Sequence, residues 1–322
     1  MKRPLPSIYL RLPSPVAPLV RAPLLERLLA RAGGSSPATD WRGDAFRLIA
    51  PDGAPPPAPG AAALFAARGP GDGACAYLAT PVHYEAAMTS VHLAPQGILR
   101  FEAAQAAQLA ADFNRRFAGG GQRLIAGGGA LIMVFDRALV ADTHDPQEAL
   151  GLDIGPFQAV GADANGLRRL GSEIEMWLFD HALNRPGATG GSPPVSGLWL
   201  WGGGAVVQRL PAIDGWTAGD DALFGAWPAA ATAARAAATH AVALHTTAGH
   251  GSRSGVVVLS SPPGTDGWPA AEAHWLWPAA AELAAGRLRC LSLSAGRRCH
   301  AVDARFKWRL WRRPRPWWEY FA

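Results

Sequence analysis

The sequence predicts an α/β fold in which a mixed sheet is covered by helices on both faces. Short apolar stretches alternate along the chain with amphipathic or alanine-rich stretches, an order that is typical of α/β proteins. Two strand candidates, residues 123–126 and 130–135, are separated only by glycines, which favours a hairpin and argues against a purely parallel sheet. Hydrophobic residues make up 49% of the 322 residues, and we expect one domain over residues 1–322.

The first sixty residues predict a strand, a helix and a surface loop. Residues 7–12 (SIYLRL) predict a short strand. Residues 23–32 carry leucines at helical spacing and precede two glycines, which predicts a helix. The proline-rich residues 51–60 cannot join a sheet ladder. We interpret them as a surface loop and not as a domain linker, because the residues before them hold too little apolar area to fold alone.

The next segment predicts strands around a helix. Strands are expected at residues 74–80 and 90–93, with the peptide PVHYEAAM between them as a loop. Residues 102–117 are rich in alanine and glutamine and precede three glycines, so they form the clearest helix of the sequence.

Residues 172–204 carry the most information. Ser172 and Glu175 have the spacing of a capping box, which predicts that a helix begins there. His181 would lie near the C-terminal end of that helix, as a capping or packing residue or as a ligand. A strand at residues 198–201 (LWLW) then leads into three consecutive glycines.

The three glycines have two interpretations. They favour a tight turn that positions two indoles; the alternative is a loop whose backbone N–H groups approach an anion. No Lys-Ser/Thr pair follows, and the spacing is not that of a dinucleotide fingerprint. The residues of the alternative anion site would be Arg185, Trp199, Trp201, Gly202, Gly203, Gly204 and Arg209.

The C-terminal part predicts a strand, a helix, a hairpin and a tail. The strand is expected at residues 255–260, the alanine-rich helix at 269–285 and the hairpin over 288–306. The tail, residues 307–322, holds four tryptophans and five basic residues. Because indole faces accept guanidinium groups, we expect the tail to fold back on the body. The alternative is an exposed docking site for an acidic partner or a membrane surface.

Composition argues against several classes of partner. The net charge of +5 comes almost entirely from arginine, but no basic helix stripe or nucleic-acid motif accompanies it, so we expect no nucleic-acid partner. The three cysteines form no C-x-x-C pair, which predicts neither a disulfide framework nor a zinc ribbon. No uncharged apolar run is long enough for a transmembrane helix, and prolines interrupt the N-terminus where a signal peptide would be apolar. We therefore expect a soluble, cytoplasmic protein.

A family resemblance rests on four segments of the chain. They are ATPVHYEAAMTSVHL, EIEMWLFDHALNR, HALNRPGATGGSPPVSGLWLWGGG and WRLWRRPRP. The third resembles a segment of archaeal-type cofactor-independent phosphoglycerate mutases, and the set resembles bacterial regulatory proteins of the RpfE type, which are phosphoglycerate-mutase-like. The resemblance implies an alkaline-phosphatase-like fold.

The sequence differs from the mutases in the residues that would bind the metal ions and carry the reaction. The resemblance implies two metal ions, a Ser or Thr nucleophile and a spread of Asp and His ligands, and two divalent ions need several carboxylates to offset their charge. The first strand, SIYLRLPS, carries no Asp. The sequence therefore predicts no metal site, although five residues are conceivable ligands: His83, His92, Asp136, Asp180 and His181. His240, His245 and His250 lie at five-residue steps, which place them on no common face.

These observations predict a non-catalytic or regulatory protein that resembles phosphoglycerate mutases and retains a vestigial anion pocket. We expect no cofactor; the partner would be a small anion or another protein. The alternative is a phosphoglycerate-mutase-like or other phosphate-ester enzyme with an unrecognised ligand set.

Overall fold

The computed structural model describes residues 5–15, 20–50, 54–185, 193–227, 253–259 and 267–322. Contacts divide the chain into two compact units. Unit 1 comprises Met1–Pro56 and Pro211–Ala322, and unit 2 comprises Pro57–Leu210. Both combine sheets with helices, so the predicted α/β class is confirmed. The single domain expected from the sequence stays a prediction, because this division describes packing and not independent folding.

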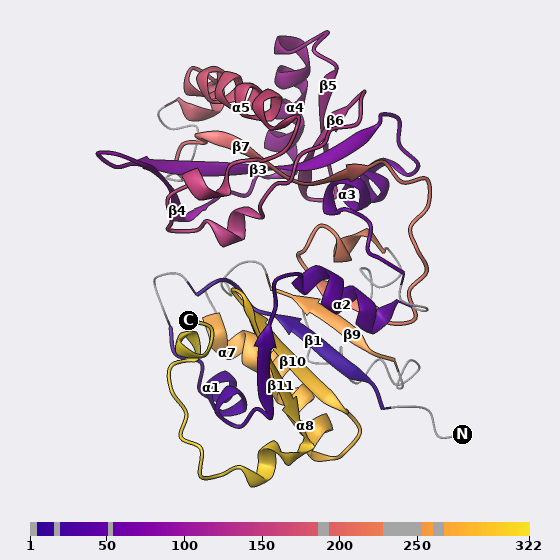
Figure 1. The fold of residues 1–322 in the computed structure, drawn as a ribbon, viewed down its shortest axis with the longest axis vertical. Helices are drawn as coiled ribbons and strands as arrows, with labels where there is room; N and C mark the ends of the chain where they lie inside the picture. The colour runs from indigo at the N-terminus through magenta and orange to yellow at the C-terminus, as the bar shows by residue number, and fades with distance from the viewer. Residues whose placement is uncertain (1–4, 16–19, 51–53, 186–192, 228–252, 260–266) are drawn as a thin grey trace. The chain divides into compact units, whose positions relative to one another are not determined.

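Unit 1 contains a six-stranded mixed sheet in the order β2-β11-β10-β1-β9-β8. The first strand β1 lies between two strands from the far end of the sequence, as Figure 1 shows, and pairs with both in parallel. The predicted hairpin is confirmed as the antiparallel pair β10 and β11. The strand bounds are β1 Ser7–Arg11, β2 Gly34–Pro37, β8 Trp216–Gly219, β9 Gly255–Val258, β10 Cys290–Ala295 and β11 Arg298–Asp303.

Helices cover both faces of this sheet. The predicted first helix, α1 (Pro23–Ala30), turns its leucines onto the same core as Ile8 and Leu10 of β1. On the other face, Trp41 of α2 (Trp41–Ile49) stacks under the guanidinium of Arg11. The predicted helix at 269–285 is α7, a π-helical turn η7 and α8; the bounds are α7 Gly267–Ala271, η7 Glu272–Leu276 and α8 Trp277–Ala284.

Unit 2 contains a second sheet, entirely antiparallel, which the sequence does not predict. Its centre is the long strand β3, which pairs with β6 and β4 along one edge and with β7 along the other. The prediction that PVHYEAAM forms a loop is wrong, because residues 81–86 continue β3. The strand bounds are β3 Cys75–Ala86, β4 Val91–Ile98, β5 Gln122–Gly127, β6 Ala130–Phe135 and β7 Gly197–Ala205.

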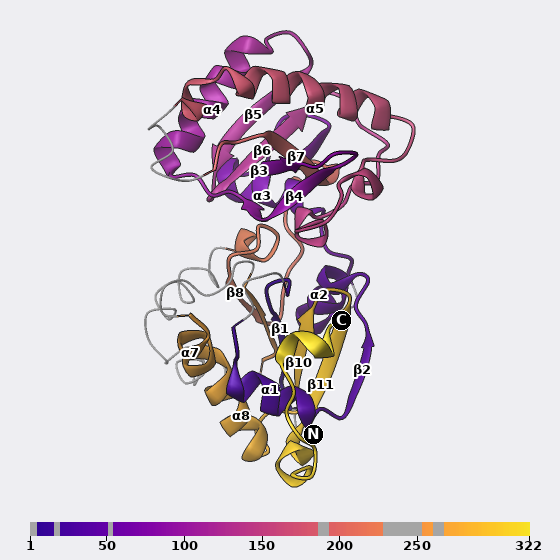
Figure 2. The same ribbon diagram turned by 90° about the vertical axis from the view of Figure 1, so that its left-hand side faces the viewer.

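The helices of unit 2 lie on opposite sides of this sheet, with α4 and α5 on one side and α3 on the other (Figure 2). The predicted helix at 102–117 is confirmed as α4 (Ala103–Arg116), and the side chain and backbone of Glu102 form a capping box with Gln105. Helix α3 (Pro59–Arg68) begins inside the proline-rich stretch, of which residues 51–53 lie outside the described part of the chain.

The predicted start of the next helix at Ser172 is wrong. Helix α5 runs over Ala164–Phe179, so Ser172 and Glu175 lie in its second half and form no cap. A glycine inside a helix lowers the stability of the helix by about 1 kcal/mol relative to alanine. In the sequence, Gly171 therefore resembles a helix boundary. Burial of Leu167, Leu170 and other apolar residues against the sheet outweighs that cost.

Short 3-10 turns complete the chain, at η2 Pro146–Glu148, η3 Gly155–Phe157, η4 Ala182–Asn184, η5 Phe224–Ala226, η8 Ala304–Trp308 and η9 Trp317–Tyr320. The tail has two parts. Trp317 and Phe321 are buried in the core of unit 1, whereas Trp308 and Trp311 are exposed. Among the described helices, none has the length and apolar character needed to cross a bilayer.

Candidate functional site

The three glycines of the LWLWGGG stretch are part of strand β7 and do not form a turn after it. Leu78 pairs with Trp201, and Ala76 pairs with Gly204. Two residues of β7, Gly202 and Gly203, therefore lie opposite the single residue Tyr77, and this irregular pairing is a β-bulge. Gly202 adopts a φ of 61°, a conformation that favours glycine. A Cβ on Gly203 would lie 2.0 Å from Cε1 of Tyr77. The glycines therefore serve the packing of a buried tyrosine.

The residues of the predicted anion site do not converge. The indole N–H of Trp199 donates to the carbonyl of His144 at 2.7 Å, and that of Trp201 donates to Oγ1 of Thr80 at 2.8 Å. Arg185 and Arg209 are both exposed and lie beyond opposite ends of β7.

The five conceivable metal ligands are also dispersed. His83 on β3 donates from Nδ1 to the carbonyl of Pro194 at 2.9 Å, and His92 on β4 contacts Oγ of Ser90 at 2.9 Å. Asp136 follows β6 beside Arg123, and Asp180 is the C-terminal cap of α5. Among the described residues, no three His, Cys, Asp or Glu side chains are grouped as metal ligands. His240, His245 and His250 lie outside those residues.

His181 has a packing role, which was one of the two expectations for it. Its Nε2 lies 3.2 Å from Oδ2 of Asp112, its Nδ1 accepts from the N–H of Leu183, and its ring packs edge-on against Trp177. Hydrogen bonds from Gln108 and Arg115 lower the pKa of Asp112, so this carboxylate stays ionised beside the imidazole. The pair ties α4 to the end of α5.

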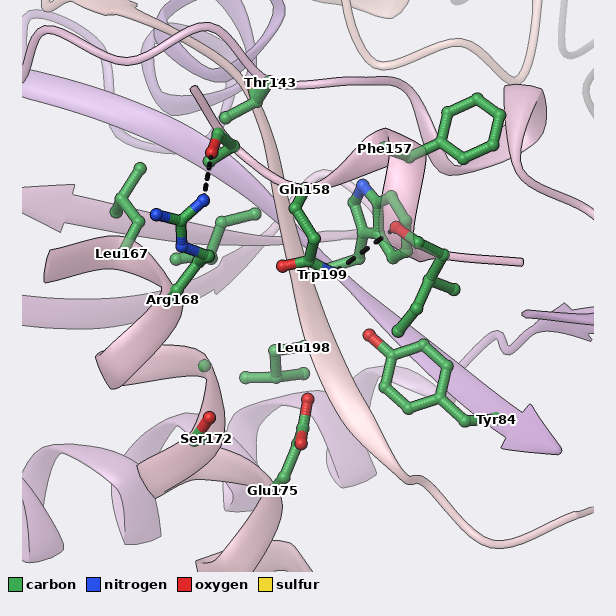
Figure 3. Close-up of a pocket in the computed structure, with 14 residues that line it drawn as sticks. Tyr84, Thr143, Phe157, Gln158, Leu167, Arg168, Ser172, Glu175, Leu198 and Trp199 are labelled. Carbon is green, nitrogen blue, oxygen red and sulfur yellow. Dashed lines mark hydrogen bonds between the residues drawn. The ribbon is translucent and has the colours of Figure 1, made fainter. Parts of the chain in front are cut away.

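A pocket of about 300 Å³ opens in unit 2 between α5, β7 and the loop around η3 (Figure 3). Its walls combine apolar and polar side chains, and the apolar ones include Phe157, Leu167, Leu198 and Trp199. Polar side chains enter from three elements that are far apart in the sequence, and Figure 3 shows them around one space. They are Tyr84, Thr143, Gln158, Arg168, Ser172 and Glu175.

Tyr84 and Glu175 lie together at one end of this pocket. A Cβ on Gly197 would lie 3.2 Å from Cε2 of Tyr84 and 3.4 Å from Cγ of Glu175, so the absence of a side chain at 197 leaves room for both. Within the described residues, neither the Tyr84 hydroxyl nor the Glu175 carboxylate has a hydrogen bond or an ion pair. Their polar atoms are therefore available to a ligand.

The electrostatics of this end follow from the partial desolvation of its two polar side chains. Partial desolvation by the surrounding side chains raises the pKa of Glu175 above its ordinary value, although the residue is exposed to solvent. Burial raises the pKa of Tyr84 further, and the nearby charge of Glu175 adds to that shift. Because desolvation without a partner disfavours the carboxylate, a cation or a hydrogen-bond donor placed there would stabilise it.

The opposite end of the pocket is formed by the first half of α5. Arg168 lies seven residues, or about 10 Å, before Glu175 along the helix. It donates from Nη1 to the carbonyl of Ala159 at 3.0 Å and also contacts Asn165. Between the two charges, Gly171 lines the pocket, and a Cβ there would meet nothing within 4 Å. The arginine fixes the η3 loop against α5, and Gly171 keeps the space open.

The sequence predictions identified part of this lining for other reasons. Ser172 and Glu175 were expected to cap a helix and Trp199 to lie in a strand, while Tyr84, Gln158 and Arg168 carried no signal. The signal that could have found the pocket is the mid-helix Gly171, a residue that weakens α5 unless its missing side chain is needed.

No protein-family model matches the chain, and no curated protein matches it in sequence. Among solved structures, the chain is similar to a cofactor-independent phosphoglycerate mutase from Thermoplasma acidophilum, with 14% identity, a TM-score of 0.36 and coverage of 94% of this chain and 90% of the other. It is also similar to the PH0037 protein from Pyrococcus horikoshii, with 14% identity, a TM-score of 0.37 and coverage of 94% and 88%. At this level of similarity no activity or ligand is transferred to this chain, and membership of the RpfE-type regulatory group stays a prediction.

Proposed function

We propose that this protein is a non-catalytic, regulatory protein that binds a small organic molecule in the pocket between α5 and β7. The observation that carries the proposal is the pair of Tyr84 and Glu175, two polar groups at one end of the pocket that have no hydrogen-bond or ion-pair partner among the described residues. Such a combination of apolar walls and a few placed polar groups is typical of small-molecule sites.

The chemistry of the pocket favours a ligand that carries a cation or a hydrogen-bond donor. The Glu175 carboxylate would accept from that group, while Tyr84 and Trp199, whose rings are 6.5 Å apart, would cover its apolar part. Arg168, at the other end, already donates to the carbonyl of Ala159, so it would contribute less to the binding of an anionic ligand. This proposal replaces the vestigial anion pocket expected from the glycines.

The lining also supports a role without catalysis. Ser172 is the only hydroxyl on α5 in the lining, and the described residues around it supply no imidazole side chain to activate it. His144 reaches Trp199 through its backbone carbonyl. A phosphate-ester enzyme, the alternative function, would need a nucleophile and a base in hydrogen-bond reach of each other.

Binding is tested with three probes that share a phenylethyl body: 2-phenylethylamine, 2-phenylethanol and 3-phenylpropionate. In saturation-transfer NMR we expect the amine to bind best and the carboxylate worst. Gly171→Leu fills the pocket from the helix without a backbone clash and should abolish binding of the amine. Gly166→Leu is the matched control, since Gly166 lies in the same helix, has equally open space and does not line the pocket.

Two outcomes would contradict the proposal. If no probe distinguishes the Gly171→Leu protein from the Gly166→Leu protein, the pocket is not a binding site. If the protein turns over phosphoglycerate or a phosphate monoester in the presence of manganese, and chelation abolishes that turnover, the non-catalytic role is wrong and the enzyme alternative replaces it.

A further inference from the structure

The tail contains apolar side chains that its own packing leaves exposed. We call residues 307–315 the tail patch. Four consecutive residues of the patch, 308–311, include three large apolar side chains that are largely exposed. The exposed fraction is 70% for Trp308, 66% for Leu310 and 73% for Trp311. A cluster of this kind on a soluble surface normally marks an interaction site, because exposed tryptophan is costly in water.

The exposure is local and does not come from a loose tail. Only a few residues later, Trp317 is 3% exposed, packs on Trp268 and donates from Nε1 to the carbonyl of Val20 at 2.9 Å. The patch itself is fixed by basic side chains. Arg309 donates to the carbonyl of Arg31 at 2.8 Å and Arg312 to that of Ala32 at 2.7 Å. The fold therefore holds these apolar side chains in water.

The charged residues of the patch are all basic, and one of them, Arg309, forms an ion pair with Asp303 at 3.3 Å. Lys307, Arg309, Arg312, Arg313 and Arg315 are basic, and no Asp or Glu occurs between Asp303 and Glu319. Arginines and a lysine thus flank each exposed apolar side chain in the sequence. Basic residues interleaved with exposed indoles suit a diffuse negative surface that has an apolar layer beneath it.

We propose that the tail patch docks on the surface of an anionic lipid bilayer. Trp308 and Trp311 would lie in the interfacial layer, the region that indoles prefer, with Leu310 beside them. The exposed side chains of Lys307, Arg313 and Arg315 would face the lipid headgroups, where each adds attraction that falls off within a Debye length. Binding of this kind is peripheral and reversible, and it needs no helix that spans the bilayer.

The test is co-sedimentation of the full chain with large vesicles. We expect binding to vesicles of phosphatidylcholine mixed with phosphatidylserine, little binding to phosphatidylcholine alone, and loss of binding at high salt. A blue shift of tryptophan emission should accompany binding. The double variant Trp308→Ser/Trp311→Ser should weaken binding about tenfold, and Arg313→Glu should weaken it through charge alone.

The matched control is Trp277→Ser. Trp277 is an equally accessible tryptophan of unit 1, 55% exposed on α8, but it lies outside the patch. It should leave vesicle binding unchanged. The melting temperature of the double variant should match that of the natural protein, because neither indole is buried. Equal binding to both lipid mixtures, or equal binding by the double variant, would overturn the proposal. Binding to polyglutamate without binding to the phosphatidylserine vesicles would instead assign the patch to an acidic protein partner.

Discussion

Unit 1 and unit 2 use their polar side chains differently. In unit 1, Glu272 is 8% exposed, and its Oε1 accepts from the backbone N–H groups of Leu24 and Leu25 at 2.7 and 2.9 Å. The carboxylate comes from the π-helical turn and caps the start of α1, a position that favours negative charge. Asp221 likewise holds Arg42 and accepts from the N–H of Leu223. These buried charges are used by the fold.

In unit 2 the corresponding groups are not used in this way. The side chains of Glu175 and Tyr84 line a pocket, and within the described residues they have no hydrogen-bond or ion-pair partner. Glu175 is exposed and only partly desolvated, and a ligand that supplies a cation or a hydrogen-bond donor would stabilise its carboxylate. The comparison teaches that burial or a shifted pKa does not mark a site by itself; the lack of a partner does.

The largest expected effect separates the two glutamates. Glu272→Ala leaves two buried N–H groups without an acceptor and should lower the free energy of unfolding by about 3 kcal/mol. Glu175→Gln removes an exposed, partly desolvated charge that has no partner among the described residues, so it should leave that free energy unchanged or slightly raised. Urea denaturation of both variants makes the measurement. A large loss of stability in Glu175→Gln would show that this carboxylate is structural, and the distinction between the units would fail.

A smaller effect is expected at the glycine run of unit 2. Gly203→Ala should cost about 2 kcal/mol of stability, since its Cβ would overlap the ring of the buried Tyr77. The added Tyr77→Leu substitution should recover part of the loss of Gly203→Ala, which a double-mutant cycle measures. Binding of 2-phenylethylamine should persist in Gly203→Ala. If that variant were stable but unable to bind, the glycines would belong to the binding site and not to the packing.

The smallest effect is a pH dependence that originates in unit 1. His300 is buried and donates from Nε2 to the carbonyl of Tyr320 at 2.8 Å, and burial lowers its pKa. Below its ordinary pKa the unfolded chain binds more protons at this residue than the folded chain. Its contribution to stability is therefore complete above about pH 6.5 and is lost as the pH falls, by at most about 1.4 kcal/mol per pH unit.

His300→Gln keeps a donor near the Tyr320 carbonyl but cannot titrate, so its stability should fall less between neutral and acidic pH. Thermal melts across that range make the measurement, and His144→Gln, which changes a solvent-accessible imidazole, serves as the control. Identical pH profiles for the natural protein and His300→Gln would remove His300 as the source.

Elements with a strong local pattern could be predicted from the sequence. The leucine spacing of residues 23–32 gives α1, the glycine-closed alanine-rich stretch gives α4, and the alternating stretches on either side of Gly296 give the β10–β11 hairpin. These patterns suffice because the residues that satisfy one another are neighbours along the chain. The same local reasoning placed the start of α5 eight residues too late, since only contacts with the sheet offset Gly171.

The candidate site depended on tertiary structure. Tyr84 was expected in a loop, and nothing near it in the sequence shows that β3 extends past residue 80 and brings it beside Glu175. The glycines of β7 resembled an anion loop until Tyr77, more than a hundred residues earlier, was found against them. By itself the sequence determined the α/β class, the basic tail and the lack of a recognisable ligand set. Only the tertiary structure decided which polar groups keep a partner, because partners are set by contacts between distant parts of the chain.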